Sequence, residues 1–473
     1  MGTPLKDISD TFSCLYERRS TRVYDEDKDI SDDILLKIMD VARYAPPTPD
    51  GDFPWRFIAA KQESTRKLYA NCAIEVARLA FGTSFESFGS HLWYMPEETR
   101  MRVAEYTTSG ALWRYPETAS VVMVPLLSVG GWGRGTASLL QTASLLGPYL
   151  GFAVQNMWLA ATSYGVGGGY NAMANLDARR REIVCAYLGI PRTFEPCGAY
   201  TFGYSPTSRA SGPSRGPLEG LAFSEVWGNN YERLAFRNGS DGIDIPQTNI
   251  IDTIKNLNLV RSFKDTRVDD WKIERMLDVA LWAPCPENLK NWRYLVIRDK
   301  RAKEFLYKSV NEKSHTTFYF IDPETQYARL WHIKEEERLA ELEKVLERGM
   351  GEWLPTADTL IMVIDLEGWI DSAHMGVTSA SPNCFHIIST GCAIQNMMLA
   401  GTALGLGVNF DPTIAHDARL TGMVRDYFGL PNSCHVLGIV GVGEPGAKMD
   451  RAPLPPMEAL FFEEYWGNPL TKK

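Results

Sequence analysis

Apolar residues recur at two different spacings along this chain, and each spacing predicts one kind of element. In residues 32–44 the apolar positions, such as Ile34, Ile38 and Val41, lie three or four residues apart, which predicts an amphipathic helix. Residues 154–164 are apolar on nearly every side. Such a pattern is typical of a buried central helix.

Short apolar or β-branched runs bounded by turn residues predict strands. They occupy residues 57–60, 120–127, 201–203 and 435–442. The acidic stretch 334–348 has helical spacing, and its charges are expected on a solvated face. Because helices and strands do not alternate regularly, the pattern favours an α+β fold over a doubly wound sheet.

The pattern also repeats itself once along the chain. Matching segments lie 238 to 240 residues apart (284 − 46 and 395 − 155, for example), and chance matches would not keep one offset over two hundred residues. The matches include Ala45-Pro46 with Ala283-Pro284, Gln155-Asn156-Met157 with Gln395-Asn396-Met397, Asp177-Ala178-Arg179 with Asp417-Ala418-Arg419, and Trp227-Gly228-Asn229 with Trp466-Gly467-Asn468.

A chain of 473 residues exceeds what one hydrophobic core usually supports, so two domains are expected on length alone. Residues 237–242, Arg-Asn-Gly-Ser-Asp-Gly, have the composition of a linker. The repeat therefore predicts two tandem copies of one domain, at residues 1–237 and 245–473. We call them copy one and copy two.

Composition excludes several classes of protein. The chain is 45% hydrophobic and 23% charged, which is ordinary for a globular protein, and its net charge of −9 argues against a nucleic-acid partner. Its eight cysteines include no Cys-x-x-Cys pair and predict buried reduced thiols. Neither a signal peptide nor a membrane-spanning run is apparent, so we expect a cytoplasmic location and no membrane partner.

The first candidate for chemistry is the Arg-Arg-Ser-Thr-Arg segment at residues 18–22. Guanidinium groups offer planar pairs of donors and a serine hydroxyl adds a short one, so Arg18, Arg19, Ser20 and Arg22 suit a phosphate monoester. The alternative is an exposed basic turn paired with the acidic residues 25–27.

Other chemistries find less support. Six of the seven histidines lie in copy two without metal-binding spacing, and no nucleophile or Walker motif occurs. The glycines at residues 165–169 follow a helix and are first of all expected to cap it, which excludes a dinucleotide fingerprint. Asn156 and Asn396 lie in apolar helices, where a structural hydrogen-bonding role is expected.

Five motifs in a fixed order resemble the nitroreductase family of flavoproteins. They are the Arg-rich segment at 18–22, the Ala-Pro turn that leads to Pro-Trp-Arg-Phe at 54–57, the Gln-Asn-Met helix at 155–157, the glycine run at 165–169 and Leu-Gly-Ile-Pro at 188–191. The resemblance implies an α+β fold that works as an intertwined dimer with FMN at the interface. Here the two copies would form that dimer within one chain.

The resemblance also implies that each flavin takes its phosphate contacts from one subunit and a turn from the other. Copy two has Leu257-Asn258-Leu259 where copy one has Arg18-Arg19-Ser20. Conversely, copy two keeps the family's turn, with Pro284, Cys285 and Asn288, whereas copy one lacks the Asn. One complete flavin site is therefore expected, and a second pseudo-site would lack both parts.

Further contacts are implied by the same resemblance. Arg114 is a candidate phosphate ligand, and Arg215 matches the family's late phosphate-binding arginine, although Arg451 matches equally well. The alternative for Arg215 is a surface ion pair. Gly168, Gly169 and Asn171 are candidate contacts to the flavin ring through the backbone.

The activity implied is an FMN-dependent oxidoreductase that takes a hydride from NAD(P)H and reduces a small organic acceptor. The cofactor carries the chemistry, so no catalytic side chain and no metal are expected. Residues 130–146 and 366–388 are candidates to cover the flavin face. Two alternatives remain open: a flavin-dependent dehydrogenase or oxidase of a biosynthetic pathway, and a non-catalytic FMN-binding protein.

Overall fold

A computed structural model describes most of the chain. The described residues are 8–49, 51–81, 95–129, 139–206, 215, 217–232, 245–285, 290–320, 334–338, 340, 351–366, 381–416, 418–447, 451 and 453–470. The expected linker at 237–242 and most of the acidic stretch at 334–348 lie outside them.

In copy one the helices and strands follow each other with these bounds: α1 Thr11–Glu17, α2 Asp32–Asp40, η1 Val41–Tyr44, β1 Trp55–Ala60, α3 Glu63–Phe81, α5 Glu97–Thr108, η3 Ala111–Arg114, β2 Val121–Ser128, α6 Leu139–Ser163, β3 Gly167–Asn171, α7 Met173–Leu176, α8 Ala178–Leu188, β4 Phe194–Pro196, β5 Ala199–Gly203 and β6 Ala222–Ser224.

Copy two repeats this order: α9 Ile250–Asn256, α10 Asp270–Ala280, β7 Trp292–Ile297, α11 Lys300–Phe320, β8 Thr359–Leu366, α14 Ser381–Ala403, β9 Gly407–Asp411, η5 Thr413–His416, α15 Ala418–Phe428, β10 Cys434–Gly443, α16 Met457–Leu460 and β11 Phe461–Glu463.

Two mixed sheets carry the same strand order, which confirms the α+β prediction. One runs β11-β1-β2-β5-β3, with β4 also paired to β2, and the other runs β6-β7-β8-β10-β9. In both, the outermost pair, β11 with β1 and β6 with β7, is parallel and the other pairs are antiparallel. The sequence repeat is therefore a structural repeat.

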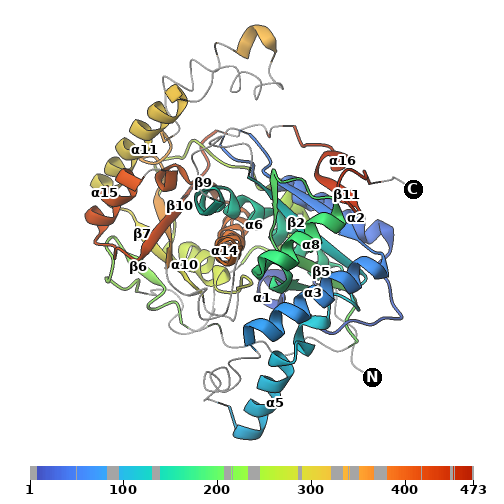
Figure 1. Ribbon diagram of the computed structural model, residues 1–473. Coiled ribbons are helices and arrows are strands. Elements are labelled where there is room, and N and C mark those ends of the chain that lie inside the picture. Colours follow the sequence, from blue (N-terminus) through green and yellow to red (C-terminus); the bar gives the residue numbers. More distant parts are fainter. Residues whose placement is uncertain are drawn as a thin grey trace.

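Each copy gives its last strand to the other copy's sheet. The strand β6, from copy one, pairs with β7, and β11, from the end of copy two, pairs with β1. In Figure 1, β6 accordingly lies among the copy-two strands, and the red β11 lies beside α2 and β2 of copy one. The exchange covers an edge of each sheet with a strand of the other copy.

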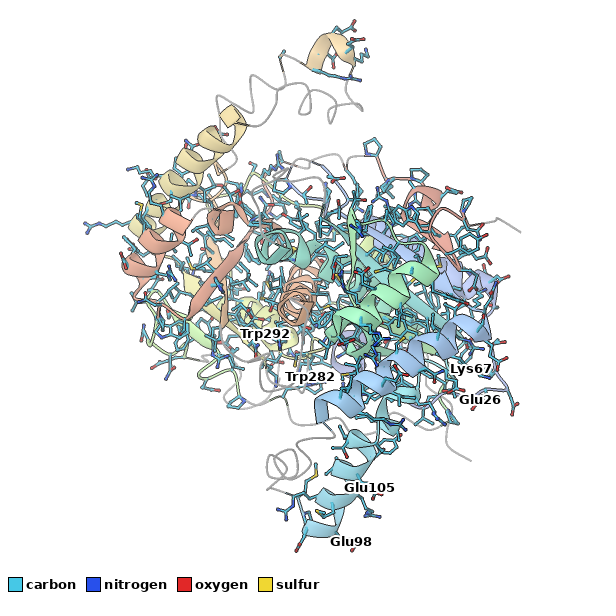
Figure 2. All side chains as sticks on the ribbon, viewed as in Figure 1. Glu26, Lys67, Glu98, Glu105, Trp282 and Trp292 are labelled. Carbon is cyan, nitrogen blue, oxygen red and sulfur yellow. The ribbon has the colours of Figure 1, made fainter. Side chains whose placement is uncertain are left out.

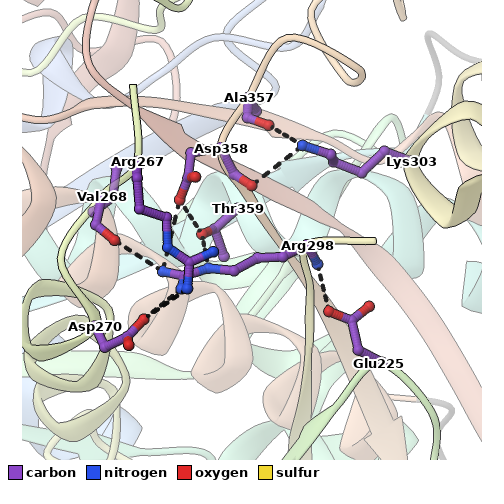
Figure 3. Close-up of polar contacts among 9 residues, drawn as sticks. All are labelled: Glu225, Arg267, Val268, Asp270, Arg298, Lys303, Ala357, Asp358 and Thr359. Carbon is purple, nitrogen blue, oxygen red and sulfur yellow. Dashed lines mark hydrogen bonds and ion pairs between the residues drawn. The ribbon is translucent and has the colours of Figure 1, made fainter. Parts of the chain in front are cut away.

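A glutamate fixes each exchanged strand. Glu225 follows β6 with a left-handed backbone (φ 64°), and its carboxylate accepts hydrogen bonds from the backbone N–H groups of Arg298 (2.8 Å) and Asp299 (3.3 Å). Figure 3 shows Glu225 within a polar cluster around Arg298. Glu464 repeats the arrangement after β11, with φ 65° and bonds from Lys61 and Gln62.

Around Arg298 the polar groups satisfy one another. Its guanidinium donates to Thr359 Oγ1 (2.7 Å) and the Val268 carbonyl (3.1 Å), and it contacts the Asp270 carboxylate. Nearby, Lys303 Nζ donates to the Ala357 carbonyl at 2.7 Å (Figure 3). The cluster thus has a structural role, since it joins β6, β7 and β8 at one edge.

The helices α6 and α14 cross at the centre of the molecule and join the copies (Figure 1). They are in close contact at two glycines, where a Cβ built on Gly151 would lie 2.7 Å from the Gly391 Cα, and one built on Gly391 would lie 2.7 Å from the Pro148 Cα. No side chain fits at either position.

Four amides beside this crossing form a reciprocal network. Gln155 donates to Asn396 (2.7 Å) and Gln395 donates to Asn156 (2.8 Å), while the two asparagine side chains donate to the carbonyls of Val41 and Val279. All four side chains are fully buried. The structural role predicted for Asn156 and Asn396 is confirmed.

Sequence patterns located the elements better than their ends. The predicted helix at 32–44 is α2 followed by the 3-10 turn η1, and the central helix begins at Leu139 instead of residue 154. The glycine run was only partly a cap. Gly165 (φ 72°) ends α6, but Gly167 already begins the strand β3, because the chain turns straight into the sheet. Among the described helices, none combines the length and apolarity needed to cross a bilayer.

Candidate functional site

The segment that leaves α1 places Arg18 inside the protein. Asp10 is the N-cap of this helix and its carboxylate accepts from the Ser13 N–H, and Arg18 is the C-cap. The Arg18 side chain is only 1% exposed and lies over the Trp158 ring, with its Cζ 4.6 Å from the ring centroid. The burial of Arg18 argues against the alternative in which this residue belongs to an exposed basic turn.

Arg18 meets copy two at Trp282. Its Nη2 donates to the Trp282 carbonyl at 2.9 Å, whereas Nε and Nη1 are buried with no hydrogen-bond partner among the described residues. The structure likewise records no carboxylate partner for Arg18 within that part of the chain. An unmatched buried cation costs about 3–5 kcal/mol. A bound anion would lower this cost, because it would accept hydrogen bonds from the two nitrogens without a partner and offset the charge.

Two further arginines converge on the same indole. The Cζ of Arg19 lies 4.7 Å from the Trp282 ring centroid and that of Arg215 lies 5.2 Å from it. Tyr16 packs edge-on against the ring, with centroids 5.5 Å apart. Figure 2 shows Trp282 near the middle of the view, where the two copies meet. The late arginine of copy one therefore joins the Arg-rich segment.

The turn of copy two completes the cluster with Cys285 and Lys290. Burial raises the pKa of the Cys285 thiol, although Lys290, Arg215 and Arg18 act to lower it. Burial lowers the pKa of Lys290, and the Arg215 charge lowers it further. The turn thus brings a thiol and a fourth cation to the three arginines.

The repulsion between these cations affects the pKa of Arg18. Burial lowers the pKa of its guanidinium to about 9, and the nearby charges of Arg215 and Arg19 contribute. Arg18 remains a cation at neutral pH. A bound dianion would relieve both the desolvation and the repulsion, because it supplies acceptors and opposite charge together. The arrangement of Arg18, Arg19, Arg215 and Lys290 therefore suits a phosphate group.

The equivalent position in copy two is built differently. Leu257 is the C-cap of α9, as Arg18 is of α1, and it is buried. Arg451, the counterpart of Arg215, donates to the Leu257 carbonyl and lies over the Tyr44 ring, 5.1 Å from its centroid. The only other cation placed at this ring in the described part of the chain is Lys255, at 5.8 Å. Among the described residues, fewer cations therefore converge at this position in copy two than at Trp282.

Ser20 and Arg22 follow Arg19 in the chain, which here runs along the edge of β3, the strand that contains the glycines. Ser20 is exposed and forms a β-bridge with Gly168, and the next N–H, of Thr21, donates to the Gly168 carbonyl at 2.7 Å. Arg22 is exposed and hydrogen-bonds the Tyr115 hydroxyl. As phosphate ligands these two residues stay a prediction, since their side chains are not among those gathered at Trp282.

Close packing explains why β3 has glycine at positions 168 and 169. A Cβ on Gly168 would lie 2.7 Å from Cδ1 of Trp158, and one on Gly169 would lie 2.7 Å from Oγ1 of Thr201. Asn171 is fully buried, donates to the Trp113 carbonyl (3.1 Å) and accepts from the Met173 N–H (3.0 Å). Its side chain is therefore engaged within the protein, and its carbonyl also accepts from the Tyr69 hydroxyl at 3.4 Å. The contact to a flavin ring stays a prediction.

The remaining predicted residues divide into three cases. Arg114 ends η3 with its side chain 67% exposed, and its Nε lies 3.7 Å from the Glu117 carboxylate, so the contacts recorded for it are to its own turn. Pro284 is half-buried beside Cys285, in the turn that carries Trp282. Asn288 lies outside the described residues.

Trp282, Trp158 and Lys290 were not among the site residues predicted from the sequence. The signal for Trp282 was present, because it directly precedes the Ala-Pro turn and copy one has another aromatic residue, Tyr44, at that point. Lys290 could also have been found, since copy one has Phe53 at the corresponding position before its Trp. Neither pattern by itself indicates which arginines contact the Trp282 ring.

No group of three or more His, Cys, Asp or Glu side chains that could hold a metal ion occurs among the residues that the structure describes. The cations gathered at Trp282 would themselves repel a metal ion. The site as built is one for an anion.

Comparison with known proteins gives a consistent picture. The sequence profile of the nitroreductase family matches residues 15–111, 149–204 and 259–444, which fall in both copies. A protein of Archaeoglobus fulgidus, provisionally named NADH dehydrogenase/NAD(P)H nitroreductase, is 22% identical over 191 residues, which are 40% of this chain and 82% of that protein.

Similar solved structures include a BluB-like flavoprotein of Clostridium difficile 630, with 17% identity, 45% of this chain and 97% of that chain covered, and a TM-score of 0.35. Another is an FMN-dependent nitroreductase of Clostridium difficile R20291, with 18% identity, 43% and 91% covered, and a TM-score of 0.30.

Proposed function

The chain belongs to the nitroreductase family of flavin oxidoreductases, and we propose that it binds one FMN between its copies and uses it to pass a hydride from NAD(P)H to a small organic acceptor. The observation that carries the proposal is the buried Arg18, whose Nε and Nη1 have no partner among the described residues. Arg19 and Arg215 lie near it, and Lys290 lies near Arg215. Such a cradle fits the phosphate of a mononucleotide.

Each copy contributes a different part of the proposed site. Copy one supplies the arginines, and copy two supplies Trp282, Pro284 and Cys285. The Trp282 carbonyl orients Arg18 from one side and the Trp158 ring supports it from the other, so the guanidinium is held in place before an anion arrives. This preorganisation lowers the entropic cost of binding.

When bound, FMN supplies the two-electron redox chemistry. The part of the protein is to hold the phosphate and to keep water from the buried end of the site. Cys285 is not proposed as a nucleophile, because its pKa is raised by burial and the neutral thiol is the less reactive form.

The test is flavin counting on the purified protein and on Arg18→Leu, which installs the residue that copy two has at Leu257. The wild type is expected to bind one FMN per chain. Arg18→Leu is expected to raise the Kd for FMN at least about 100-fold, since a buried charge-assisted contact contributes about 3 kcal/mol. Titration of protein fluorescence with FMN measures the Kd.

Leu257→Met is the matched control, because it changes the same helix end of the other copy and keeps the volume. It should leave both the Kd and the count of one FMN unchanged. A colourless wild type that does not bind added FMN, or a count of two, would contradict the proposal. Anaerobic addition of NADPH then tests the reductant: bleaching of the bound flavin within seconds is expected.

A further inference from the structure

Two polar side chains are buried against each other beside the turn of copy two. Asn291 is 4% exposed and His386, in the first turns of α14, is 7% exposed. The Asn291 Nδ2 lies 3.0 Å from the His386 Nδ1. On their other sides, His386 Nε2 and Asn291 Oδ1 are buried and have no hydrogen-bond partner among the described residues. Two orphaned polar atoms in one pair are unusual, because each costs about 1–3 kcal/mol.

The hydrogen bond within the pair determines what the two free atoms can do. An amide nitrogen only donates, so His386 Nδ1 accepts and the neutral ring carries its proton on Nε2. Burial lowers the pKa of His386 to about 4, which keeps the ring neutral at pH 7. The pair therefore presents one N–H donor from His386 and one carbonyl acceptor from Asn291. The opposite amide orientation would exchange the two roles and still leave one donor and one acceptor.

Copy one shows that the fold does not need these polar groups. The repeat aligns Asn291 with Pro54 and His386 with Leu146, and neither of those side chains offers a hydrogen bond. Leu146 is buried to a similar degree, with 5% exposure. Packing alone thus accepts an apolar pair at this place, and the polar pair stands only in the copy that supplies the turn to the complete site.

Both members of the pair are joined in the chain to residues of the proposed flavin site. Asn291 directly follows Lys290, which belongs to the cation cluster and has a left-handed backbone (φ 41°) that is rare outside glycine. His386 directly follows Phe385, whose ring packs edge-on against Tyr170 of the glycine strand β3, with centroids 6.0 Å apart. The residue that precedes each member of the pair therefore contacts one part of the site, Lys290 the cation cluster and Phe385 the strand β3.

We propose that His386 and Asn291 form a polar subsite of the complete flavin site that binds an amide or imide group, in which an N–H lies beside a C=O. The inference rests on the proposed function. Two molecules of that function carry such a group: the flavin has it at the pyrimidine edge of its ring, and NAD(P)H has it as the carboxamide of nicotinamide. The pair acts by positioning through two hydrogen bonds, and no proton transfer is required of it.

The test replaces His386 by Leu, the residue that copy one has, and by Gln, which keeps an N–H near the position of Nε2. Three quantities are measured for each purified protein: the melting temperature without flavin, the Kd for FMN, and the KM and kcat for NADPH. His386→Leu is expected to change the flavin-free melting temperature little, because it removes the orphaned Nε2 but leaves the Asn291 Nδ2 without its partner. His386→Gln should restore binding to within about threefold of the wild type.

The two sources of the group predict different shifts in His386→Leu. A tenfold or larger increase in the Kd for FMN assigns the subsite to the flavin ring. An unchanged Kd with a tenfold or larger increase in the KM for NADPH assigns it to the nicotinamide. If the Kd and the KM both stay within twofold of the wild type, or if the only effect is a lower melting temperature, the pair is structural and the inference is overturned.

Leu146→Met is the matched control, since it alters the equivalent position of copy one with little change of volume, and all three quantities should stay unchanged. The wild-type flavin count separates the two levels of the argument. A wild type with one FMN and an ineffective His386→Leu overturns only the subsite, whereas a wild type that binds no FMN overturns the proposed function and the subsite with it.

Discussion

At the scale of single residues, Arg18 illustrates how a charged side chain can be buried before its ligand arrives. The Trp158 ring lies under the guanidinium, and the Trp282 carbonyl accepts one of its hydrogen bonds. Its other two nitrogens have no partner in the part of the chain that the structure describes. The protein accepts this local cost because the remaining packing is close and apolar. Neighbours of Arg18 should therefore affect anion binding without touching the anion.

Gly168→Ala tests such an indirect effect. The added Cβ would overlap the Trp158 indole, so the ring must shift and Arg18 above it must follow. We expect a loss of about 1–3 kcal/mol in the free energy of unfolding, as for other overpacked positions, together with a weaker affinity for FMN. Thermal unfolding and FMN titration measure the two effects, and an unchanged Kd would show that Trp158 does not position Arg18.

His386 should make stability depend on pH. Its pKa is about 4 in the folded protein, against an ordinary value of about 6.5, so the unfolded chain takes up the proton first as the pH falls. The stability that rests on neutral His386 is complete above about pH 6.5 and decreases toward pH 4, by at most about 1.4 kcal/mol per pH unit.

The measurement compares the wild type with His386→Leu, so that the carboxylates common to both proteins cancel. The free energy of unfolding of the wild type should fall relative to that of the variant as the pH decreases from 7 to 4.5. A difference that stays constant over this range would mean that His386 is not buried as a neutral ring.

At the scale of elements, the crossing of α6 and α14 depends on backbone contact. Gly151 and Gly391 face each other there, and a Cβ on Gly391 would overlap Pro148 of α6. The amides of Gln155, Gln395 and their asparagine partners lie close by and fix the register of the two helices. The glycine contact that positions the two helices and the hydrogen bonds that fix their register thus lie within the same few turns.

Gly391→Ala should separate the two helices and lower the free energy of unfolding by about 1–3 kcal/mol. Gly422→Ala is the matched control, because Gly422 lies within α15 and a Cβ there meets nothing within 4 Å. That change should stabilise the protein by up to about 1 kcal/mol, the helix preference of alanine over glycine. Chemical denaturation measures both, and equal effects of the two substitutions would contradict close contact at the crossing.

At the scale of the whole molecule, the two copies form one structure although they are consecutive in the chain. They share the α6–α14 crossing, and each sheet contains a strand from the other copy. The symmetry is broken at the arginines, at the Trp282 turn and at the His386 pair. Duplication followed by specialisation of one interface is consistent with this distribution.

Cutting the chain between the copies tests this unity. With a protease site inserted within residues 237–245, the cleaved halves should stay together in gel filtration and keep their FMN, because the exchanged strands and the central helices still hold them. Separation should require denaturant. Halves that separate in neutral buffer would show that the linker is needed for assembly, and would contradict the proposed domain boundary.

The sequence by itself determined the repeat, the α+β class, the buried central helices and the asymmetry between Arg18 and Leu257. These follow from local periodicity and from comparing the chain with itself, which need no knowledge of three-dimensional contacts. Of the predicted site residues, the structure gathers Arg18, Arg19, Arg215 and Cys285 near Trp282. Among the described residues, Ser20, Arg22 and Arg114 have no recorded contact with that cluster, and all seven residues stay predicted flavin ligands.

Only the tertiary structure decided which side chains meet. Trp282 meets Arg18 across 264 residues of chain, and β6 and β11 pair with strands of the other copy. Such contacts depend on how two sheets and two helices pack and not on any local pattern. The His386–Asn291 pair belongs to the same class: its residues stand 95 positions apart, and their unsatisfied atoms become apparent only once burial is known.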